Sequence, residues 1–337
     1  MHRSEITIDL AALRRNVATV LRAVEKSELW AVVKADAYGH GAVDVARAAL
    51  GAGASALCVV TVAEALELRG AFPDARILCM APVEDVRAAR DARLELAVTG
   101  PRIPEGVRVH LKLDTGMGRF GLSELVEPTR NVVGLMSHLA TSDMDAGFAR
   151  AQIARFDELT REHAHLTRHV ANSAAALRIP ESRFDAVRCG IALYGLSPFD
   201  GDPAADGLEP VLSWRSHLAL VKQLQPGQST GYGRRFIAER PTWIGLVPIG
   251  YADGFRRGLT GTRVLVDGDA RRVVGTISMD SFAVELEREL PRGTPVTLLG
   301  DGLRAEHHAT ILGTVNYEVV TAINSDARRA RREVVDA

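Results

Sequence analysis

The sequence predicts an α/β protein with a (β/α)8 TIM-like barrel, trimmed around strands 4–6, followed by a mainly β C-terminal domain. Up to about residue 195, short apolar runs alternate with amphipathic, helix-like stretches. From about Pro210 the runs are β-like and are divided by glycine and proline turns. The chain has 337 residues, too many for one ordinary hydrophobic core. We therefore expect a barrel over residues 8–205 and a β domain over residues 206–337 together with 1–7.

Eight apolar runs are the candidate barrel strands. They cover residues 30–35, 56–60, 77–80, 94–98, 107–113, 132–139, 168–172 and 186–193. Helix-like stretches fall between most of them, at residues 42–50, 62–69, 83–92 and 147–163. Because the chemistry of such barrels gathers at the C-terminal ends of the strands, polar residues there are the site candidates.

Two connections of this barrel are unusually lean. Residues 99–106 join the fourth and fifth runs, although a parallel crossover usually takes a dozen residues or more. Pro101 and Pro104 disfavour a helix there. The next link offers only residues 123–129 as a helix candidate. We expect the barrel to lack about one helix and to be thinned at another.

The second domain should contain six β-like runs. They lie at residues 212–224, 242–248, 263–266, 273–278, 281–286 and 295–299. Residues 5–9 alternate like a strand and are expected to pair with this domain. The arginine-rich residues 328–332 are predicted to be a solvated end rather than a nucleic-acid patch.

Composition limits the classes of partner. A formal net charge of −1 favours neither nucleic acid nor an anionic membrane as partner. Three scattered cysteines (Cys58, Cys79 and Cys189) form no disulfide framework or zinc pattern, so we expect reduced thiols in the cytoplasm. Neither a signal peptide nor a membrane span is expected. No metal site is expected, because no carboxylate or cysteine pattern accompanies the clustered histidines (His163, His165, His169, His307 and His308).

Lys34 is the strongest single candidate for chemistry. It is one of four lysines, and it ends a short apolar run just before a glycine-rich turn. A desolvated amine has a lowered pKa and forms a Schiff base with an aldehyde more readily. The position therefore suits a lysine that holds an aldehyde cofactor.

Residues 33–41, with the sequence VKADAYGHG, resemble the pyridoxal-phosphate lysine signature of the alanine racemase family. Further segments similar to that family follow in order at residues 8–16, 112–121, 137–140, 171–174, 187–195, 231–233, 249–254, 277–280 and 316–318. It is this order over nearly the whole chain that makes the resemblance specific. It implies pyridoxal 5'-phosphate as cofactor and the racemisation of alanine, supplying D-alanine for cell-wall synthesis.

Inverting an α-carbon requires a proton to leave one face and return to the other, and this is simplest with two bases. The resemblance assigns these bases to Lys34 and Tyr232. A phenol with a pKa near 10 needs nearby positive charge or hydrogen bonds to act at neutral pH, and Arg188 and His138 are the candidates for that support. Arg188 is also implied to face the pyridine nitrogen of the cofactor. Its permanent charge would disfavour protonation of that nitrogen and leave a weaker electron sink, which favours racemisation.

The resemblance also implies the ligands of the cofactor phosphate. They are the side chains of Tyr38, Ser173 and Tyr317 and the backbone N–H groups of Gly190 and Ile191.

The substrate carboxylate is expected to bind Arg119 and the backbone of Met279. Lys112 resembles a lysine that is often carbamylated in the family, and the alternative is an unmodified strand lysine paired with a carboxylate. Asp280 either helps to position the site or is a structural carboxylate. Tyr251 and Tyr317 resemble residues that narrow the substrate entrance, which favours a small amino acid.

An obligate homodimer with composite sites is implied, because Tyr232, Tyr251, Met279 and Asp280 resemble residues that reach the partner subunit's cofactor. Three alternatives stay open: a racemase of broader or serine preference, a non-catalytic pyridoxal-phosphate barrel, and a barrel decarboxylase. A non-catalytic pyridoxal-phosphate barrel would lack the β domain. A barrel decarboxylase would be expected to place an acidic group where Arg188 stands. The trimmed barrel segments adjoin Lys112 and Arg119, so binding of the substrate carboxylate is the function they put in doubt.

Overall fold

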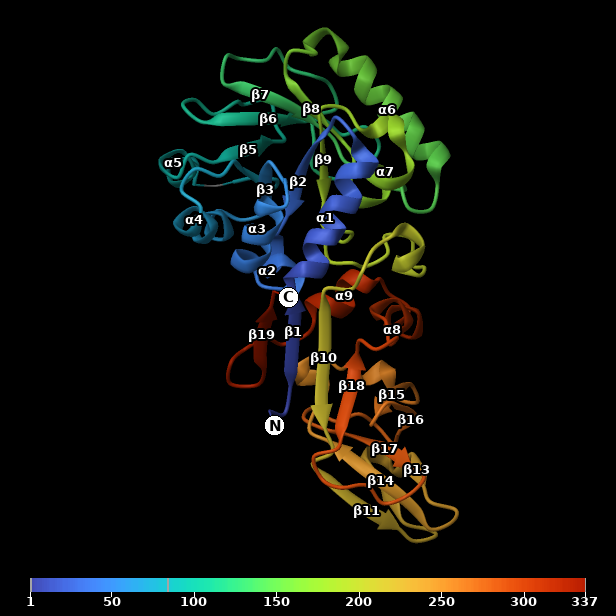
Figure 1. Cartoon of the computed structure of the whole chain (residues 1–337). Helices are drawn as coiled ribbons and strands as arrows, with labels where there is room; N and C mark the ends of the chain where they lie inside the picture. The colour runs from blue at the N-terminus through green and yellow to red at the C-terminus, as the bar shows by residue number, and fades with distance from the viewer. Residues whose placement is uncertain (1, 84, 337) are drawn as a thin grey trace. The chain divides into compact units, whose positions relative to one another are not determined.

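The computed structural model describes residues 2–83 and 85–336 and separates the chain into two compact units. One unit spans Leu10–Glu209, and the other combines the N-terminal residues up to Asp9 with the chain from Pro210 onward. Figure 1 shows the course of the chain through both units.

The first unit is a parallel β-barrel. Its strands are β2 (Glu28–Val32), β3 (Ala56–Val59), β4 (Ile77–Cys79), β5 (Glu95–Val98), β6 (Arg108–Lys112), β7 (Val132–Met136), β8 (Thr167–His169) and β9 (Ala186–Cys189). They pair in the order β8-β7-β6-β5-β4-β3-β2-β9. Backbone hydrogen bonds from Asp185 to Arg168 and from Arg188 to Ala171 join β9 to β8 and bring the sheet close to closure. All eight predicted barrel strands are therefore confirmed, with ends that differ by a few residues.

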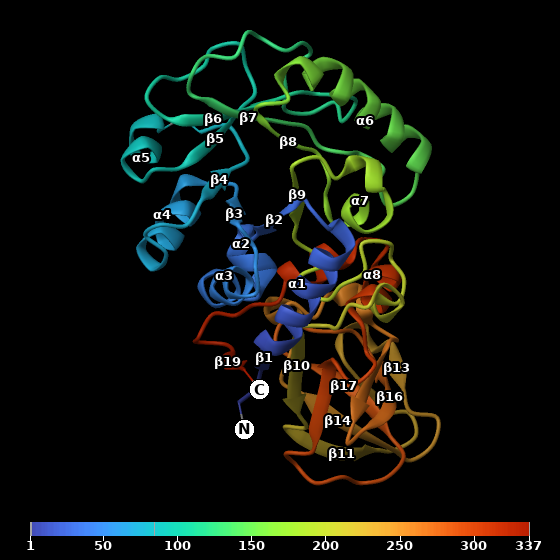
Figure 2. The same ribbon diagram turned by 45° about the horizontal axis from the view of Figure 1, so that its top comes forward.

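Helices cover the outside of this sheet, as Figure 2 shows. They are α1 (Leu10–Val24), α3 (Ala42–Gly51), α4 (Val62–Ala71), α5 (Val86–Asp91), α6 (Ala146–Thr160) and α7 (Ser173–Arg178). The short element α2 (Lys34–Gly39), which follows β2, has left-handed backbone angles in its interior. Short 3-10 turns are η1 (Arg161–His163), η2 (Pro180–Ser182) and η3 (Pro203–Asp206). The apolar side of α1 is buried, with Leu13, Val17 and Val20 inaccessible to solvent.

The two lean connections contain no helix among their described residues. Residues 99–106 are irregular, as their prolines predicted. The helix candidate at residues 123–129 was wrong, because that segment is also irregular. A proline disfavours helical backbone angles at the residue before it, so Pro128 opposes a helix at Glu127, and too few residues remain before it to form a stable helix. The barrel is thus trimmed at two connections.

The second unit is mainly β. Its large sheet runs β11-β14-β17-β16-β15-β18-β10-β1-β19. The bounds are β1 (Glu5–Asp9), β10 (Leu212–His217), β11 (Leu220–Leu224), β14 (Thr242–Val247), β15 (Arg263–Val266), β16 (Asp269–Val274), β17 (Phe282–Leu286), β18 (Pro295–Leu299) and β19 (Arg331–Val335). Smaller elements are β12 (Ser229–Thr230), β13 (Phe236–Ile237), η4 (Tyr232–Arg234), η5 (Tyr251–Asp253), η6 (Arg257–Leu259), α8 (Ala305–Leu312) and α9 (Asn316–Thr321). The predicted pairing of residues 5–9 with this domain is confirmed, because β1 lies between β10 and β19.

One expectation for this unit was wrong, and another held only in part. The run at 212–224 is two strands, since the chain turns between β10 and β11. The arginine-rich residues 328–332 are a solvated end only in part: Arg328 and Arg331 are exposed, but Arg331 begins β19 and Arg329 donates to the buried Asp253 at 2.8 Å. A count of charges along the sequence did not reveal that one of these arginines, Arg329, pairs with a buried carboxylate.

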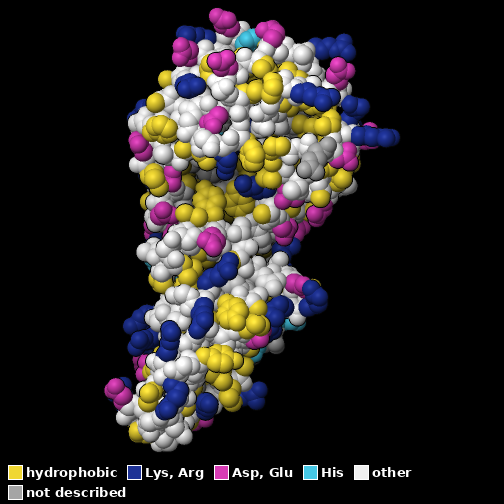
Figure 3. All heavy atoms as spheres, turned by 180° about the vertical axis from the view of Figure 1, so that it is seen from behind, with side chains coloured by type: hydrophobic (Ala, Val, Ile, Leu, Met, Phe, Trp, Pro, Cys, Tyr) yellow, Lys and Arg dark blue, Asp and Glu magenta, His cyan; other side chains and the backbone are white. Residues whose placement is uncertain are grey.

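The described helices include none that is long and apolar enough to cross a membrane. On the face shown in Figure 3, each unit carries both acidic and basic side chains.

Candidate active site

The chain leaves β2 at Val32, and Lys34 begins a short segment of unusual backbone. Ala35, Asp36, Ala37 and Tyr38 all have positive φ, between 51° and 57°. A left-handed turn costs roughly 1–2 kcal/mol per non-glycine residue, so the surroundings must enforce it. Hydrogen bonds from Ala37 N–H to the Val33 carbonyl and from Gly41 N–H to the Asp36 carbonyl, both 2.9 Å, close the turn.

The ammonium of Lys34 is in an unfavourable environment. Burial and the positive charge of Arg119 lower its pKa from the ordinary 10.5. The lowered pKa leaves a larger fraction of the amine neutral, and the neutral amine is the form that reacts with an aldehyde. The lysine thus has the electrostatic property that its sequence context predicted.

A cradle of hydroxyl and backbone N–H groups lies at the neighbouring strand ends. The Ser173 hydroxyl accepts hydrogen bonds from the backbone N–H groups of Gly190 (3.1 Å) and Ala192 (3.4 Å). A Cβ added to Gly190 would lie 2.6 Å from the Tyr38 hydroxyl, so only glycine lets the tyrosine approach this closely. The Tyr38 ring packs 4.9 Å from that of the buried Tyr194, measured between centroids. This set of donors suits a phosphate group.

Arg188 lies buried in β9 beside this cradle. Its Nη2 donates to the Ser137 carbonyl at 2.7 Å, and its Nη1 donates to the His169 carbonyl at 2.9 Å and to His169 Nδ1 at 2.6 Å. Burial lowers the pKa of Arg188 to about 10, which leaves it charged at neutral pH. Among the described residues its Nε has no hydrogen-bond partner. One donor of a fixed cation therefore remains for a bound group.

A chain of buried polar side chains, here called the barrel relay, continues from Arg188 across the barrel interior. His169 Nε2 lies 2.9 Å from His110 Nδ1, and His110 Nε2 lies 2.8 Å from Glu95 Oε2. Arg76 donates to the same carboxylate at 2.8 Å.

The two ends of the relay dictate the histidine tautomers. Arginine only donates, so His169 Nδ1 accepts and its Nε2–H donates to His110. His110 then donates from Nε2–H to Glu95. Burial lowers the pKa of both histidines, so both are neutral.

Gly134 on β7 makes room for this chain. A Cβ there would lie 2.1 Å from His110 Nδ1. The sequence interpretation missed the relay and discounted His169. A polar residue every second position in β6, at Arg108, His110 and Lys112, was the available signal, because alternate strand residues share a face.

Lys112 ends β6 in a strongly positive environment. Burial, together with the charges of Arg188 and Arg119, lowers its pKa to about 8. Among the described residues no carboxylate lies within 4.0 Å of its amine, so they supply no partner for the alternative of a carboxylate-paired lysine.

Arg119 lies on an exposed loop with an ordered backbone. Asp114 Oδ1 accepts the N–H groups of Gly116, Met117 and Gly118 at 2.8–3.1 Å, and its Oδ2 accepts that of Arg119 at 3.1 Å. One carboxylate therefore shapes the loop that presents the guanidinium, although no helix follows it.

His138 follows β7 beside the same cations. Burial and the charge of Arg188 lower its pKa to about 3, so it is a neutral hydrogen-bonding group. Its Nδ1 lies 3.4 Å from Arg188 Nη2. The predicted site residues of the first unit thus all lie at or just beyond the C-terminal strand ends of one barrel. They are Lys34, Tyr38, Lys112, Arg119, His138, Ser173, Arg188, Gly190 and Ile191.

The remaining predicted site residues lie in the β unit. Tyr232 stands between Gly231 and Gly233, both with positive φ, and its side chain is 73% exposed. Thr276 donates to the Tyr232 carbonyl at 2.9 Å and ties this turn to the next loop. The exposed phenol is thus carried on a defined backbone.

Tyr251, Met279 and Asp280 lie on two joined loops. Tyr251 N–H donates to the Ser278 carbonyl, and a Cβ on Gly250 would lie 2.3 Å from the Met279 carbonyl oxygen. Arg329 bridges Asp253 (2.8 Å) and Asp280 (2.7 Å) beneath them. The side chain of Asp280 therefore has a structural partner. Tyr317, on α9, is 37% exposed.

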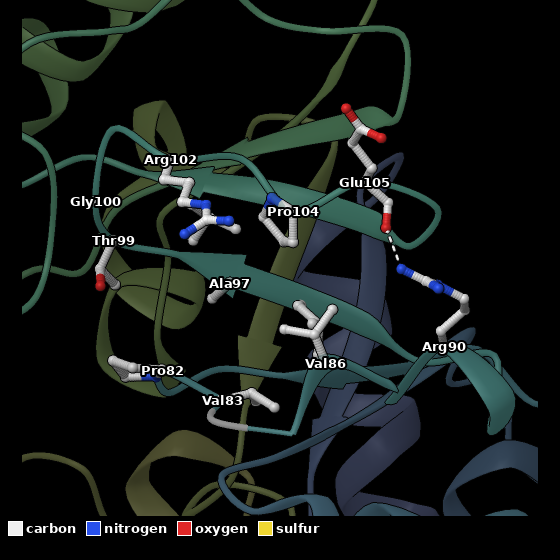
Figure 4. Close-up of a pocket in the computed structure, with 12 residues that line it drawn as sticks. Pro82, Val83, Val86, Arg90, Ala97, Thr99, Gly100, Arg102, Pro104 and Glu105 are labelled. Atoms are coloured by element: carbon white, nitrogen blue, oxygen red, sulfur yellow. Dashed lines mark hydrogen bonds between the residues drawn. The ribbon is translucent and has the colours of Figure 1, made fainter. Parts of the chain in front are cut away.

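A cavity of about 490 Å³ lies away from these residues, beside β5. It is lined by residues of α5 and of the helix-free segment before β6, including Arg90, Arg102 and Pro104 (Figure 4). It marks the place where the barrel lacks a covering helix. Among the described residues, no group of His, Cys, Asp or Glu is arranged to hold a metal ion.

The fold defines a parallel β-barrel joined to a β domain, and the barrel gathers lysine, arginine, histidine and hydroxyl side chains at the C-terminal ends of its strands. The family profiles for the alanine racemase N-terminal and C-terminal domains match residues 8–198 and 211–331. The chain belongs to the alanine racemase family.

Its relatives match over almost their whole length. It is 43% identical to the alanine racemase of Streptomyces coelicolor, over 97% of this chain and 95% of that one. It is 40% identical to alanine racemase 1 of Bacillus subtilis, over 96% of this chain and 91% of that one. Among solved structures, the alanine racemase from D-cycloserine-producing Streptomyces lavendulae has a TM-score of 0.91 at 36% identity, covering 100% of this chain and 98% of that one. The alanine racemase from Bacillus anthracis with bound L-Ala-P has a TM-score of 0.88 at 34% identity, covering 99% of this chain and 95% of that one.

Proposed function

We propose that this protein interconverts L-alanine and D-alanine with pyridoxal 5'-phosphate, supplying D-alanine for cell-wall synthesis. The observation that carries the proposal is the grouping of Lys34, the hydroxyl and N–H cradle and the buried Arg188 at one end of a barrel of this family. We further infer a cytoplasmic location from the three free, buried cysteine thiols.

The residues present fit the cofactor. The Lys34 amine would hold its aldehyde carbon, and Tyr38, Ser173 and the N–H groups of Gly190 and Ile191 would hold its phosphate, with Tyr317 as a further donor. The Arg188 Nε, which has no partner among the described residues, suits its pyridine nitrogen. When bound, the cofactor supplies the electron sink that makes the α-proton of an amino acid acidic enough to remove.

Lys34 and Tyr232 act as the two bases in this proposal, one on each face of the α-carbon. Lys34 is suited to taking a proton at neutral pH because burial and Arg119 lower its pKa. The Tyr232 phenol is exposed in its own unit, as expected for a group that must meet substrate outside that unit.

Arg119 is proposed to bind the substrate carboxylate, with the Met279 backbone as a second contact. The Asp114 cradle supports this role despite the missing helices, because it orders the Arg119 backbone within the loop itself. Tyr251 and Tyr317 are proposed to narrow the entrance, which favours a side chain as small as a methyl group.

We also propose a homodimer with composite sites, in which Tyr232, Tyr251, Met279 and Asp280 reach the cofactor of the partner subunit. The exposure of Tyr232 (73%), Met279 (52%) and Tyr251 (41%) supports it, since large apolar side chains gathered on joined loops commonly mark an interface.

The test is chiral analysis of L-alanine incubated with purified protein and pyridoxal phosphate, beside L-serine and the Tyr232→Phe variant. We expect D-alanine from the wild type and a loss of roughly 10²–10⁴-fold in the variant, the usual contribution of a general acid–base group. Rapid D-serine without D-alanine would keep the mechanism and change the substrate. Neither product would contradict the racemase and favour a cofactor carrier.

A further inference from the structure

The left-handed turn after Lys34 is supported from outside by one carboxylate. Glu64, in the first turn of α4, accepts the backbone N–H of Ala35 on Oε1 at 2.7 Å. Ala35 is the first residue of the turn and directly follows Lys34. Four successive residues with positive φ do not persist unless their surroundings enforce them.

The other oxygen of Glu64 makes an ordinary helix cap. Oε2 accepts the N–H groups of Val60 (2.9 Å) and Thr61 (3.0 Å), while the Thr61 hydroxyl accepts the N–H of Glu64 at 3.2 Å. This reciprocal pair is a capping box. The contact to Ala35 is additional to the box and contributes nothing to the α4 terminus.

The turn has a functional group at each end. Lys34 precedes it, and Tyr38 is its last left-handed residue, 2.6 Å from where a Cβ on Gly190 would lie. A support that fixes Ala35 therefore acts on both the lysine and the phosphate cradle.

Glu64 is ionised in this place. Burial raises the pKa of its carboxyl, but the backbone hydrogen bonds from Val60, Ala35 and Thr61 outweigh burial and lower it. Its charge in turn raises the pKa of Lys34, partly offsetting burial and Arg119.

We propose that Glu64 is a positioning residue for the cofactor lysine, its carboxylate holding the left-handed turn that places Lys34 and Tyr38. The inference rests on the assignment of Lys34 as the cofactor lysine. Glu64 touches neither cofactor nor substrate in this scheme and acts through the backbone of Ala35.

Glu64→Gln tests the proposal because an amide has one acceptor oxygen. Its NH2 group would face either the Ala35 N–H or the Val60 and Thr61 N–H groups, and one set of bonds is lost. Thr61→Ala is the matched control: it removes the cap bond from the threonine hydroxyl but leaves the Glu64–Ala35 contact intact. Glu67→Gln removes an exposed charge from the same helix.

Each protein is measured for its Kd for pyridoxal phosphate, its melting temperature, its kcat and KM, and the pH midpoint of Lys34 acylation without cofactor. We expect Glu64→Gln to weaken cofactor binding by roughly tenfold or more and to lower kcat more than it raises KM. Its acylation midpoint should move to lower pH, because a negative charge near Lys34 is lost. Thr61→Ala should lower the melting temperature while Kd and midpoint stay at wild-type values.

Equal Kd values and midpoints in Glu64→Gln and Thr61→Ala would overturn the proposal and reduce Glu64 to a helix cap. Borohydride reduction of the wild-type holoenzyme separates this failure from that of the proposed function. Trapping on Lys34 supports the assignment on which the inference rests. Trapping on another residue would overturn that assignment, and this inference with it.

Discussion

Lys112 illustrates how the site works at the scale of one residue. Burial, Arg188 and Arg119 lower its pKa to about 8, so a substantial share of the amine is neutral near that pH. A neutral amine adds to carbon dioxide and releases a proton, giving a carbamate anion. Such an anion would satisfy the surrounding cations, and we propose that it orients Arg119.

We therefore predict a carbamate on Lys112. In ¹³C-labelled bicarbonate the wild type should show a carbamate NMR resonance that Lys112→Arg lacks and Lys222→Arg, an exposed control, retains. KM for alanine should rise about tenfold or more in Lys112→Arg, because Arg119 loses its orienting anion. A wild type without this resonance would contradict the prediction and leave a neutral lysine at this position.

Single residues were predictable where their role is local. Lys34 and Ser173 stand at the C-terminal ends of predicted apolar runs, which places them at one barrel rim, whereas Arg188, near the start of the predicted run 186–193, was assigned by the resemblance. Glu64 and Glu95 were missed because their partners lie 29 and 15 residues away, on other elements. Nothing in the local sequence shows that a particular backbone N–H or imidazole will arrive beside them.

At the scale of elements, the barrel relay joins four strands, and its step from β6 to β8 passes over β7. Glu95 on β5, His110 on β6, His169 on β8 and Arg188 on β9 meet because alternate residues of each strand point inward. Burial alone would raise the pKa of Glu95, but hydrogen bonds from His110 and Arg76 lower it to about 2.

This shift predicts how acid destabilises the protein. The pKa of Glu95 is depressed on folding, so its contribution is complete above the ordinary value near 4.5 and is lost as pH falls to about 2. From these two values the contribution is about 3 kcal/mol. Urea unfolding at stepped pH should show wild-type stability falling through this window.

The variant Glu95→Gln should be less stable than the wild type at pH 7 and should show a smaller fall across the same window. Glu105→Gln, which changes an exposed carboxylate, should follow the wild type. An unchanged pH dependence in Glu95→Gln would show that other groups cause the acid destabilisation.

At the scale of the whole molecule, the residues proposed for the site are divided between two units that the chain builds from different segments. Lys34, Arg119 and Arg188 belong to the barrel, and Tyr232, Tyr251 and Met279 to the β unit. A site built from both subunits of a homodimer can be tested by mixing two inactive variants, which measurements of stability cannot do.

Lys34→Ala and Tyr232→Phe should each be nearly inactive alone but should complement when mixed and reassembled. Half of the dimers would be mixed and each would hold one intact site of two, so about a quarter of wild-type activity should return. A control mixture of Lys34→Ala with the double variant should stay inactive. Absence of recovery in the first mixture would mean that each site is built from a single chain.

The sequence by itself determined the eight barrel strands, the β character of the second unit and the position of Lys34, because periodicity and turn residues act over a few neighbours. Only the tertiary structure decided that β1 and β19 pair in parallel, that Arg329 neutralises Asp253, and that two histidines link Arg188 to Glu95. These contacts join residues up to hundreds of positions apart. Their energy comes from burial and charge pairing, which exist only once the chain has folded.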